Sequence, residues 1–230
     1  MSQSKAVVQK YARATRLLHH IHTAAFIILF ITGLVLFIPQ LGFLAQDSWT
    51  RIVHRLAAVV FIVAPIVYLV MKPKAALRAV ADACTWGTED VGWLKAAPRY
   101  YFLCDEEGMP AQGHMNTGQK LWWFLVIVFG AVFIVTGLVM WFLKTVAPAG
   151  LLQWMVFAHD VAFIVTGAMV FVHVYLGVIH PMMTEAWQAI SKGTVSEEYA
   201  KSHHGLWYHE QVKEENTAPP PEPKEVVEVH

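Results

Sequence analysis

The sequence has few charged residues and almost no cysteine. Only 15% of its 230 residues are charged, and its 17 basic residues are balanced by 17 acidic ones, so no feature indicates nucleic-acid binding. The two cysteines, Cys84 and Cys104, are too few for an iron–sulfur cluster or for a cysteine-rich zinc site, both of which need about four ligands. The sequence contains no CxxCH motif, which argues against covalently attached c-type haem.

Long apolar runs take the place of the missing charges, and 56% of the residues are hydrophobic. Each of four runs is long enough to cross about 30 Å of hydrocarbon as a helix. We therefore predict an all-α fold, an integral membrane four-helix bundle forming one domain over residues 1–210, with a connection over 72–120. Residues 211–230 are rich in Pro and Glu and predict a disordered tail. The predicted membrane helices span residues 17–38, 52–71, 121–143 and 151–180.

The distribution of Lys and Arg predicts the orientation of these helices. Most basic residues lie before the first run, between the second and third runs, and after the fourth. The two opposite loops hold only Arg51, Arg55 and Lys144. By the positive-inside rule, both termini are cytoplasmic, in a multi-pass protein of the inner (cytoplasmic) membrane.

Four histidines in the apolar runs form a pattern of depths. His159 and His173 lie on one predicted helix, about 21 Å apart and within about 40° of one face. Because successive helices cross in opposite directions, His54 lies at the depth of His159 and His19 at that of His173. A lone intramembrane histidine more often forms a hydrogen bond to a neighbouring helix than binds a cofactor. Two imidazoles at each of two depths instead predict two six-coordinate haems, suited to electron transfer rather than to oxygen binding.

The segment just before the third run allows two interpretations. Asn116 followed by Gln119 is close to a capping box, which would explain the segment as a helix start. Alternatively, Asn116, Gly118 and Gln119 would offer amide donors and close backbone approach to the carbonyl oxygens of a quinone. The sequence leaves both interpretations open.

The sequence also contains a set of longer motifs around and beyond these residues: Arg16-Leu17-Leu18-His19, Arg51-Ile52-Val53-His54, Asn116-Thr117-Gly118-Gln119-Lys120, His159 with His173, Gly193-Thr194-Val195-Ser196 and His203-His204-Gly205-Leu206-Trp207-Tyr208. Taken together, these motifs resemble the membrane cytochrome b (gamma) subunit of respiratory formate dehydrogenase, over nearly the whole chain to about residue 210. The resemblance implies that His54 and His159 bind an outer haem b and that His19 and His173 bind an inner haem b. It also places menaquinone, or another quinone, at the segment that begins with Asn116.

The resemblance implies a role in electron transfer between partners. An iron–sulfur subunit would deliver electrons from a catalytic molybdenum or tungsten subunit that oxidises formate, so this chain would hold no formate site itself. The loop with Cys84 and Cys104 and the Pro/Glu tail depart from the family. One alternative is therefore the cytochrome b subunit of a nickel–iron hydrogenase or of a thiosulfate or polysulfide reductase. A more distant alternative is a haem-free membrane anchor or transporter in which the histidines relay protons.

Overall fold

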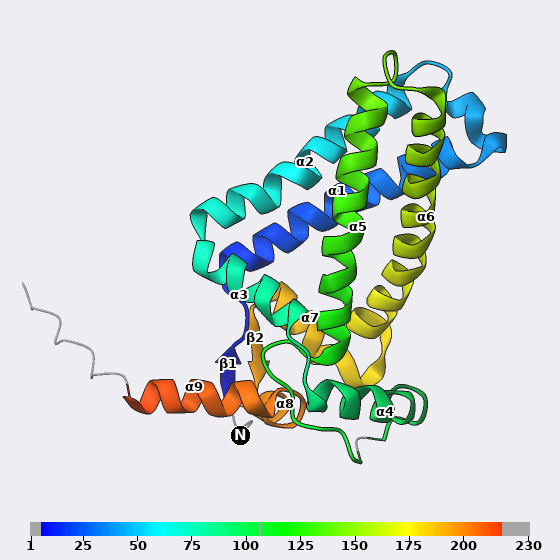
Figure 1. Ribbon diagram of the computed structural model, residues 1–230. Coiled ribbons are helices and arrows are strands. Elements are labelled where there is room, and N and C mark those ends of the chain that lie inside the picture. Colours follow the sequence, from blue (N-terminus) through cyan, green and yellow to red (C-terminus); the bar gives the residue numbers. More distant parts are fainter. Residues whose placement is uncertain (1–5, 106, 218–230) are drawn as a thin grey trace, which may run out of the picture.

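The computed structural model describes residues 6–105 and 107–217, most of which are helical (Figure 1). Short 3₁₀ turns η1 (Pro39–Ala45) and η3 (Pro181–Met183) and one π-helical turn η2 (Tyr175–Ile179) connect some of the longer elements. The strands and α-helices follow in the order β1 (Val7–Gln9), α1 (Arg13–Phe37), α2 (Trp49–Met71), α3 (Pro73–Cys84), α4 (Thr88–Leu103), α5 (Thr117–Phe142), α6 (Ala149–Val174), α7 (Thr184–Ser191), β2 (Thr194–Ser196), α8 (Glu197–His203) and α9 (Gly205–Thr217).

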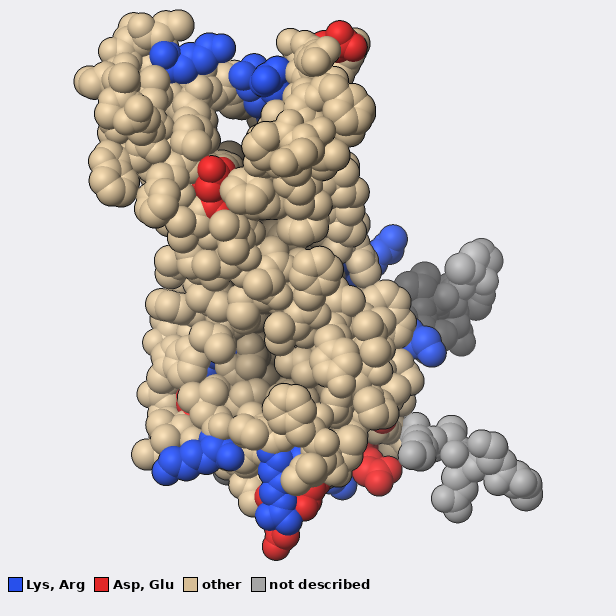
Figure 2. Space-filling model, turned by 90° about the vertical axis from the view of Figure 1, so that its right-hand side faces the viewer, with Lys and Arg blue, Asp and Glu red and all other residues tan. Residues whose placement is uncertain are grey.

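Within the described residues, four helices are long and apolar enough to cross a membrane, as predicted: α1, α2, α5, and α6 continued by η2. Many of their large apolar side chains are exposed, as expected for helices that face lipid. Figure 2 shows the Lys, Arg, Asp and Glu side chains mostly at the two ends of the molecule, with a broad band of other residues between them. The chain is therefore a multi-pass membrane protein.

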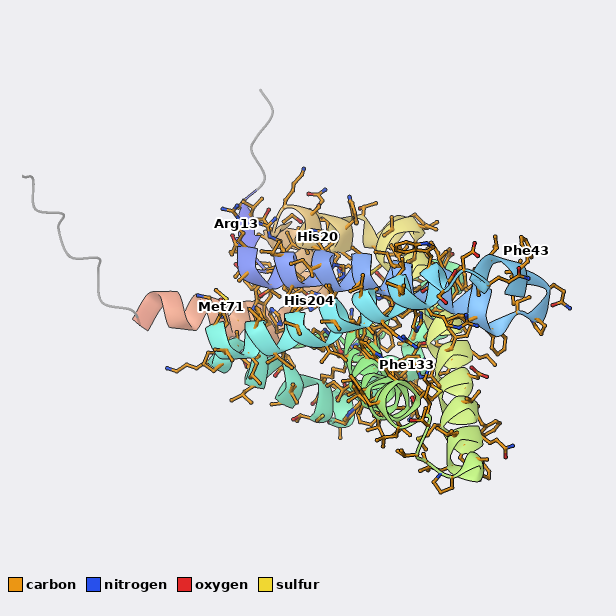
Figure 3. All side chains as sticks on the ribbon, turned by 90° about the horizontal axis from the view of Figure 1, so that it is seen from above. Arg13, His20, Phe43, Met71, Phe133 and His204 are labelled. Carbon is orange, nitrogen blue, oxygen red and sulfur yellow. The ribbon has the colours of Figure 1, made fainter. Side chains whose placement is uncertain are left out.

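The membrane helices pack as two hairpins. α1 packs mainly against α2, and α5 packs mainly against α6. Viewed from above, Arg13 and Met71 lie at one end of the first hairpin and Phe43 lies at the other (Figure 3). Contacts between α1 and α6, such as Phe30 against Phe163 at 5.3 Å between ring centroids, join the two hairpins. These contacts bring together α1, α2 and α6, the helices that carry His19, His54, His159 and His173.

The remaining elements form a cap at one end of the bundle, made of β1, α3, α4, α7, β2, α8 and α9. Strands β1 and β2 pair antiparallel, with Val8 opposite Val195. This two-stranded ribbon is an exception to the predicted all-α fold, and its β-branched valines favour extended backbone. Val195 is fully buried and packs with Tyr199 and Trp207 in a small apolar core. The ribbon thus ties the start of the chain to the segment that follows α7.

The predicted connection and the start of the predicted tail both contain helix. The connection 72–120 contains α3 and α4, while Cys84 and Cys104 are exposed and free. The last described helix, α9, continues to Thr217 and thus passes the predicted domain boundary at residue 210. The rest of the predicted tail, 218–230, lies outside the described residues.

Candidate haem and quinone sites

The first histidine pair joins α2 to α6. The rings of His54 and His159 lie 6.4 Å apart between centroids, with their planes at 54°. A metal ion bound between two imidazole nitrogens, at about 2 Å from each, separates the ring centroids by about 6 Å. The spacing of this pair therefore fits an iron atom with two axial histidines.

Each ring of this first pair is held by a threonine that the sequence analysis did not identify. Thr32 Oγ1 lies 2.8 Å from His54 Nδ1, and Thr136 Oγ1 lies 2.8 Å from His159 Nδ1. Both contacts engage Nδ1 and leave Nε2 available to a ligand. The sequence contains a signal for these residues, because the dipeptide Thr-Gly recurs in three of the predicted membrane runs, at 32–33, 136–137 and 166–167.

Two of the glycines in these dipeptides lie beside the same rings. A Cβ added at Gly137 would lie 3.8 Å from His159 Cε1. One added at Gly33 would first meet Phe163 Cε2 at 3.2 Å and would lie 3.9 Å from His54 Cε1. Side chains at these positions would therefore occupy space next to the imidazoles, where a flat macrocycle needs room. This arrangement supports the fit of a haem between the two rings.

The second histidine pair joins α1 to α6 nearer the cap. The rings of His19 and His173 lie 6.5 Å apart between centroids, with their planes at 47°. Trp122 of α5 stacks on His173 at 4.4 Å and 8°. Within residues 6–105 and 107–217, His19 Nδ1 is buried without a hydrogen-bond partner, which is costly in a folded protein. The spacing again fits an axial pair, and both pairs match the depths expected from the sequence.

The predicted capping box is confirmed at the start of α5. Asn116 Oδ1 accepts a hydrogen bond from Gln119 N at 2.9 Å, and Gln119 Oε1 accepts one from Asn116 N at 3.0 Å. Within the described part of the chain, neither side-chain amide nitrogen has a hydrogen-bond partner. Both amide groups thus keep their donors while their oxygens cap the helix. Gln119 lies about one helical turn before Trp122, the residue that stacks on His173.

Gly118 contributes differently from the expectation. A Cβ at this position would lie 3.0 Å from Trp93 Cη2. Its missing side chain therefore makes room for the indole of α4 rather than for an approaching ligand. The close contact fixes α4 against the first turn of α5.

Comparison with known proteins adds to this geometry. Residues 10–193 match the family described as prokaryotic cytochrome b561. The chain belongs to this family. It is therefore a membrane electron carrier, and membership implies haem b.

Several relatives are similar in sequence to this chain over most of their length. The chain is 25% identical to the cytochrome b556(Fdn) subunit of the nitrate-inducible formate dehydrogenase of Escherichia coli K12, over 94% of this chain and 96% of the relative. It is 24% identical to the formate dehydrogenase cytochrome b556(fdo) subunit of the same strain, over 88% of this chain and 92% of that relative. It is 22% identical to the formate dehydrogenase cytochrome b556 subunit of Haemophilus influenzae, over 88% of this chain and 83% of that relative.

In this cytochrome b561 family member, the histidines of the cap have structural contacts. His203 Nε2 and the hydroxyl of Tyr100 are 2.7 Å apart, and His204 Nδ1 lies 2.8 Å from the carbonyl oxygen of Gly113. Burial lowers the pKa of His204 well below its usual value, so this side chain is neutral at pH 7. Among the residues that the structure describes, no three or more His, Cys, Asp or Glu side chains gather in a group that could hold a metal ion.

A buried carboxylate, also missed from the sequence, anchors the candidate quinone segment. Asp90 on α4 accepts hydrogen bonds from Thr117 Oγ1 at 2.7 Å, Lys120 Nζ at 2.9 Å and Gly87 N at 2.8 Å. Burial alone would raise the pKa of Asp90, but the hydrogen bonds outweigh it and lower the pKa. Asp90 thus holds the first turn of α5 on both sides of Gly118.

We expect the Asp90→Asn variant to unfold at lower temperature, because Lys120 loses its buried carboxylate partner. Breaking a buried ion pair costs about 3 to 5 kcal/mol, and the lower end applies because Lys120 is partly exposed. Thermal unfolding in detergent at pH 7 measures the loss, and Asp90→Asn combined with Lys120→Met should recover part of it. Since the pKa of Asp90 is lowered by folding, its contribution is present above pH ~4 and is lost as the pH falls through the folded pKa. An unchanged unfolding temperature at pH 7 would contradict this role.

Proposed function

We propose that this chain is the dihaem cytochrome b subunit of a formate dehydrogenase complex. In this role it carries electrons from an iron–sulfur subunit across the membrane to a quinone. The observation that carries the proposal is the presence of two histidine pairs at two depths, with ring centroids 6.4 and 6.5 Å apart. A haem-free anchor or a proton relay has no need for two such pairs.

The histidines define the route. His54 and His159 hold the outer haem b, and His19 and His173 hold the inner haem b. Haem, when bound, would supply reversible one-electron oxidation and reduction, and ligation of its iron by both histidines of a pair would favour electron transfer over oxygen binding. The chain itself ligates and orients the two groups and shields them from water.

The start of α5 supplies the quinone site. The amide nitrogens of Asn116 and Gln119 donate hydrogen bonds to the quinone oxygens, while Gly118 keeps the helix start close to α4. The site adjoins the inner haem, whose ligand His173 is covered by Trp122. Quinone reduction takes up protons, and the excess of Lys and Arg in the segments of the cap favours a cytoplasmic cap and cytoplasmic termini.

The partners follow from the relatives, which are named as formate dehydrogenase subunits. We infer an iron–sulfur subunit that docks near the outer haem and a catalytic molybdenum or tungsten subunit that oxidises formate. In the inner membrane, such a complex would oxidise formate outside and consume protons inside. This chain carries no formate site of its own.

A haem count tests the proposal. We expect the purified protein to give a reduced-minus-oxidised spectrum of low-spin b haem and a pyridine haemochrome assay to find two haems per chain. One haem or none would contradict the dihaem assignment.

The electron donor is tested on the intact complex. Formate should reduce both haems under anaerobic conditions, and adding a quinone should reoxidise them. Reduction by hydrogen but not by formate would instead identify the donor as a nickel–iron hydrogenase. Haems that only the quinol reduces would reverse the proposed direction of electron flow.

A further inference from the structure

The two histidine pairs differ in what their Nδ1 atoms contact. His54 Nδ1 and His159 Nδ1 each lie 2.8 Å from a threonine hydroxyl. In the chain from residue 6 to 217, leaving out residue 106, the ring nitrogens of His19 and His173 have no hydrogen bond to the protein, and His19 Nδ1 is buried. The outer pair therefore has fixed hydrogen-bond acceptors that the inner pair lacks.

The direction of these hydrogen bonds follows from the other contacts of the threonines. Thr32 Oγ1 donates to the carbonyl oxygen of Ile28 at 2.7 Å, and Thr136 Oγ1 donates to that of Val132 at 2.6 Å. A hydroxyl carries a single proton, so once it donates to a carbonyl it can only accept from another group. Each threonine must therefore accept the proton of a histidine Nδ1–H. The tautomer of both rings is thereby fixed, with the Nε2 lone pair free.

An acceptor on Nδ1–H also changes the strength of the ligand. An imidazole that donates its N–H becomes a more basic ligand through its other nitrogen. A more basic ligand stabilises ferric iron relative to ferrous iron and so lowers the reduction potential. Among the residues that the structure describes, only the outer pair has such acceptors, so the effect separates the potentials of the two haems.

We propose that Thr32 and Thr136 are positioning residues that hold the outer ligands in the tautomer that binds iron and lower the potential of the outer haem below that of the inner haem. This inference rests on the proposed function, in which each histidine pair holds one haem. Its consequence is that electrons entering at the outer haem pass downhill to the inner haem and the quinone. The structure thus contains a device that favours one direction of electron flow.

The test is a redox titration of the purified complex, followed by the visible spectra of the haems, with Thr32→Val and Thr136→Val variants. Valine keeps a branched side chain but removes the hydroxyl. We expect the reduction potential of the outer haem to rise in each variant. At a fixed applied potential, its ferrous-to-ferric ratio should increase threefold to tenfold, and a tenfold increase corresponds to about 59 mV for one electron. The potential of the inner haem should not move. The outer haem is assigned as the one that is lost in His54→Ala.

The chain provides a matched control in Thr166, which also precedes a glycine on a membrane helix. Thr166 Oγ1 donates to the carbonyl oxygens of Ala162 and Phe163, and no histidine ring contacts it in the described part of the chain. Thr166→Val should therefore leave both potentials unchanged. Thr32→Ser and Thr136→Ser keep the hydroxyl and should restore the wild-type values.

The outcomes separate this inference from the proposed function. Fewer than two haems in the wild-type protein would overturn the proposed function itself. Two haems whose potentials do not change in either valine variant would overturn the role of the threonines. If the valine variants lose the outer haem, the serine variants provide the test. A serine variant that retains the outer haem at the wild-type potential supports the role of the hydroxyl. Loss of the outer haem in the serine variants as well overturns that role.

Discussion

His54→Ala and His159→Ala should each yield a protein with one haem per chain in place of two. The two rings lie 6.4 Å apart, so both contribute to one binding site, and either alanine leaves one axial position without an imidazole. The inner pair uses different residues and should keep its haem. The pyridine haemochrome count and the low-temperature difference spectrum measure the loss. Because the outer haem is the proposed entry point for electrons, formate-dependent quinone reduction should fall to background in both variants.

His20→Ala is the matched control for this experiment. His20 follows His19 directly in α1, but its side chain is exposed and belongs to neither pair. Its replacement should leave two haems and normal turnover. Two haems in both His54→Ala and His159→Ala would show that the outer pair is not a haem site, and loss of both haems would show that the two sites are not independent.

The second large effect is expected at the start of α5, where conservative variants separate the helix cap from the quinone site. Asn116→Ser and Gln119→Glu both keep an oxygen that can cap the helix but remove the amide N–H₂. If these amides hold the quinone, each variant should slow quinol formation by about 3- to 10-fold, the value of one neutral hydrogen bond. Stopped-flow reoxidation of the reduced haems by added quinone measures the rate. Both haem spectra should persist.

The stability of the same variants provides the control. Because the cap is retained, the unfolding temperatures of Asn116→Ser and Gln119→Glu should stay close to that of the wild type. Gln119→Ala removes the amide and the capping oxygen together, so it should lose both rate and stability. Unchanged reoxidation rates in Asn116→Ser and Gln119→Glu would leave the segment as a helix cap alone.

Features that depend on local helix geometry could be predicted from the sequence without the structure. The four membrane helices follow from apolar runs longer than the hydrocarbon layer, and the capping box at Asn116 depends on residues three positions apart. The depths of the four histidines follow from helix rise and from the alternating direction of successive spans. In each case a single geometric rule connects the sequence to the position.

Other features depend on contacts between distant segments. Thr32 could be recognised as a partner of His54, and Thr136 as a partner of His159, only once α1 was packed on α2 and α5 on α6. Asp90 is one of several carboxylates in the connection, and its burial against Lys120 depends on how α4 docks on α5. From the sequence, Gly118 was expected to allow close approach of a quinone, whereas in the folded chain Trp93 lies against it.

The sequence by itself determined that this chain crosses the membrane four times and which histidines share a depth, because helix geometry and the thickness of the bilayer act locally. Only the tertiary structure decided which imidazole rings lie close enough together to bind one iron atom and which polar groups orient them. Those contacts cross from one helix to another, and the rotation of each helix about its axis is set by packing against its neighbours rather than by its own sequence period.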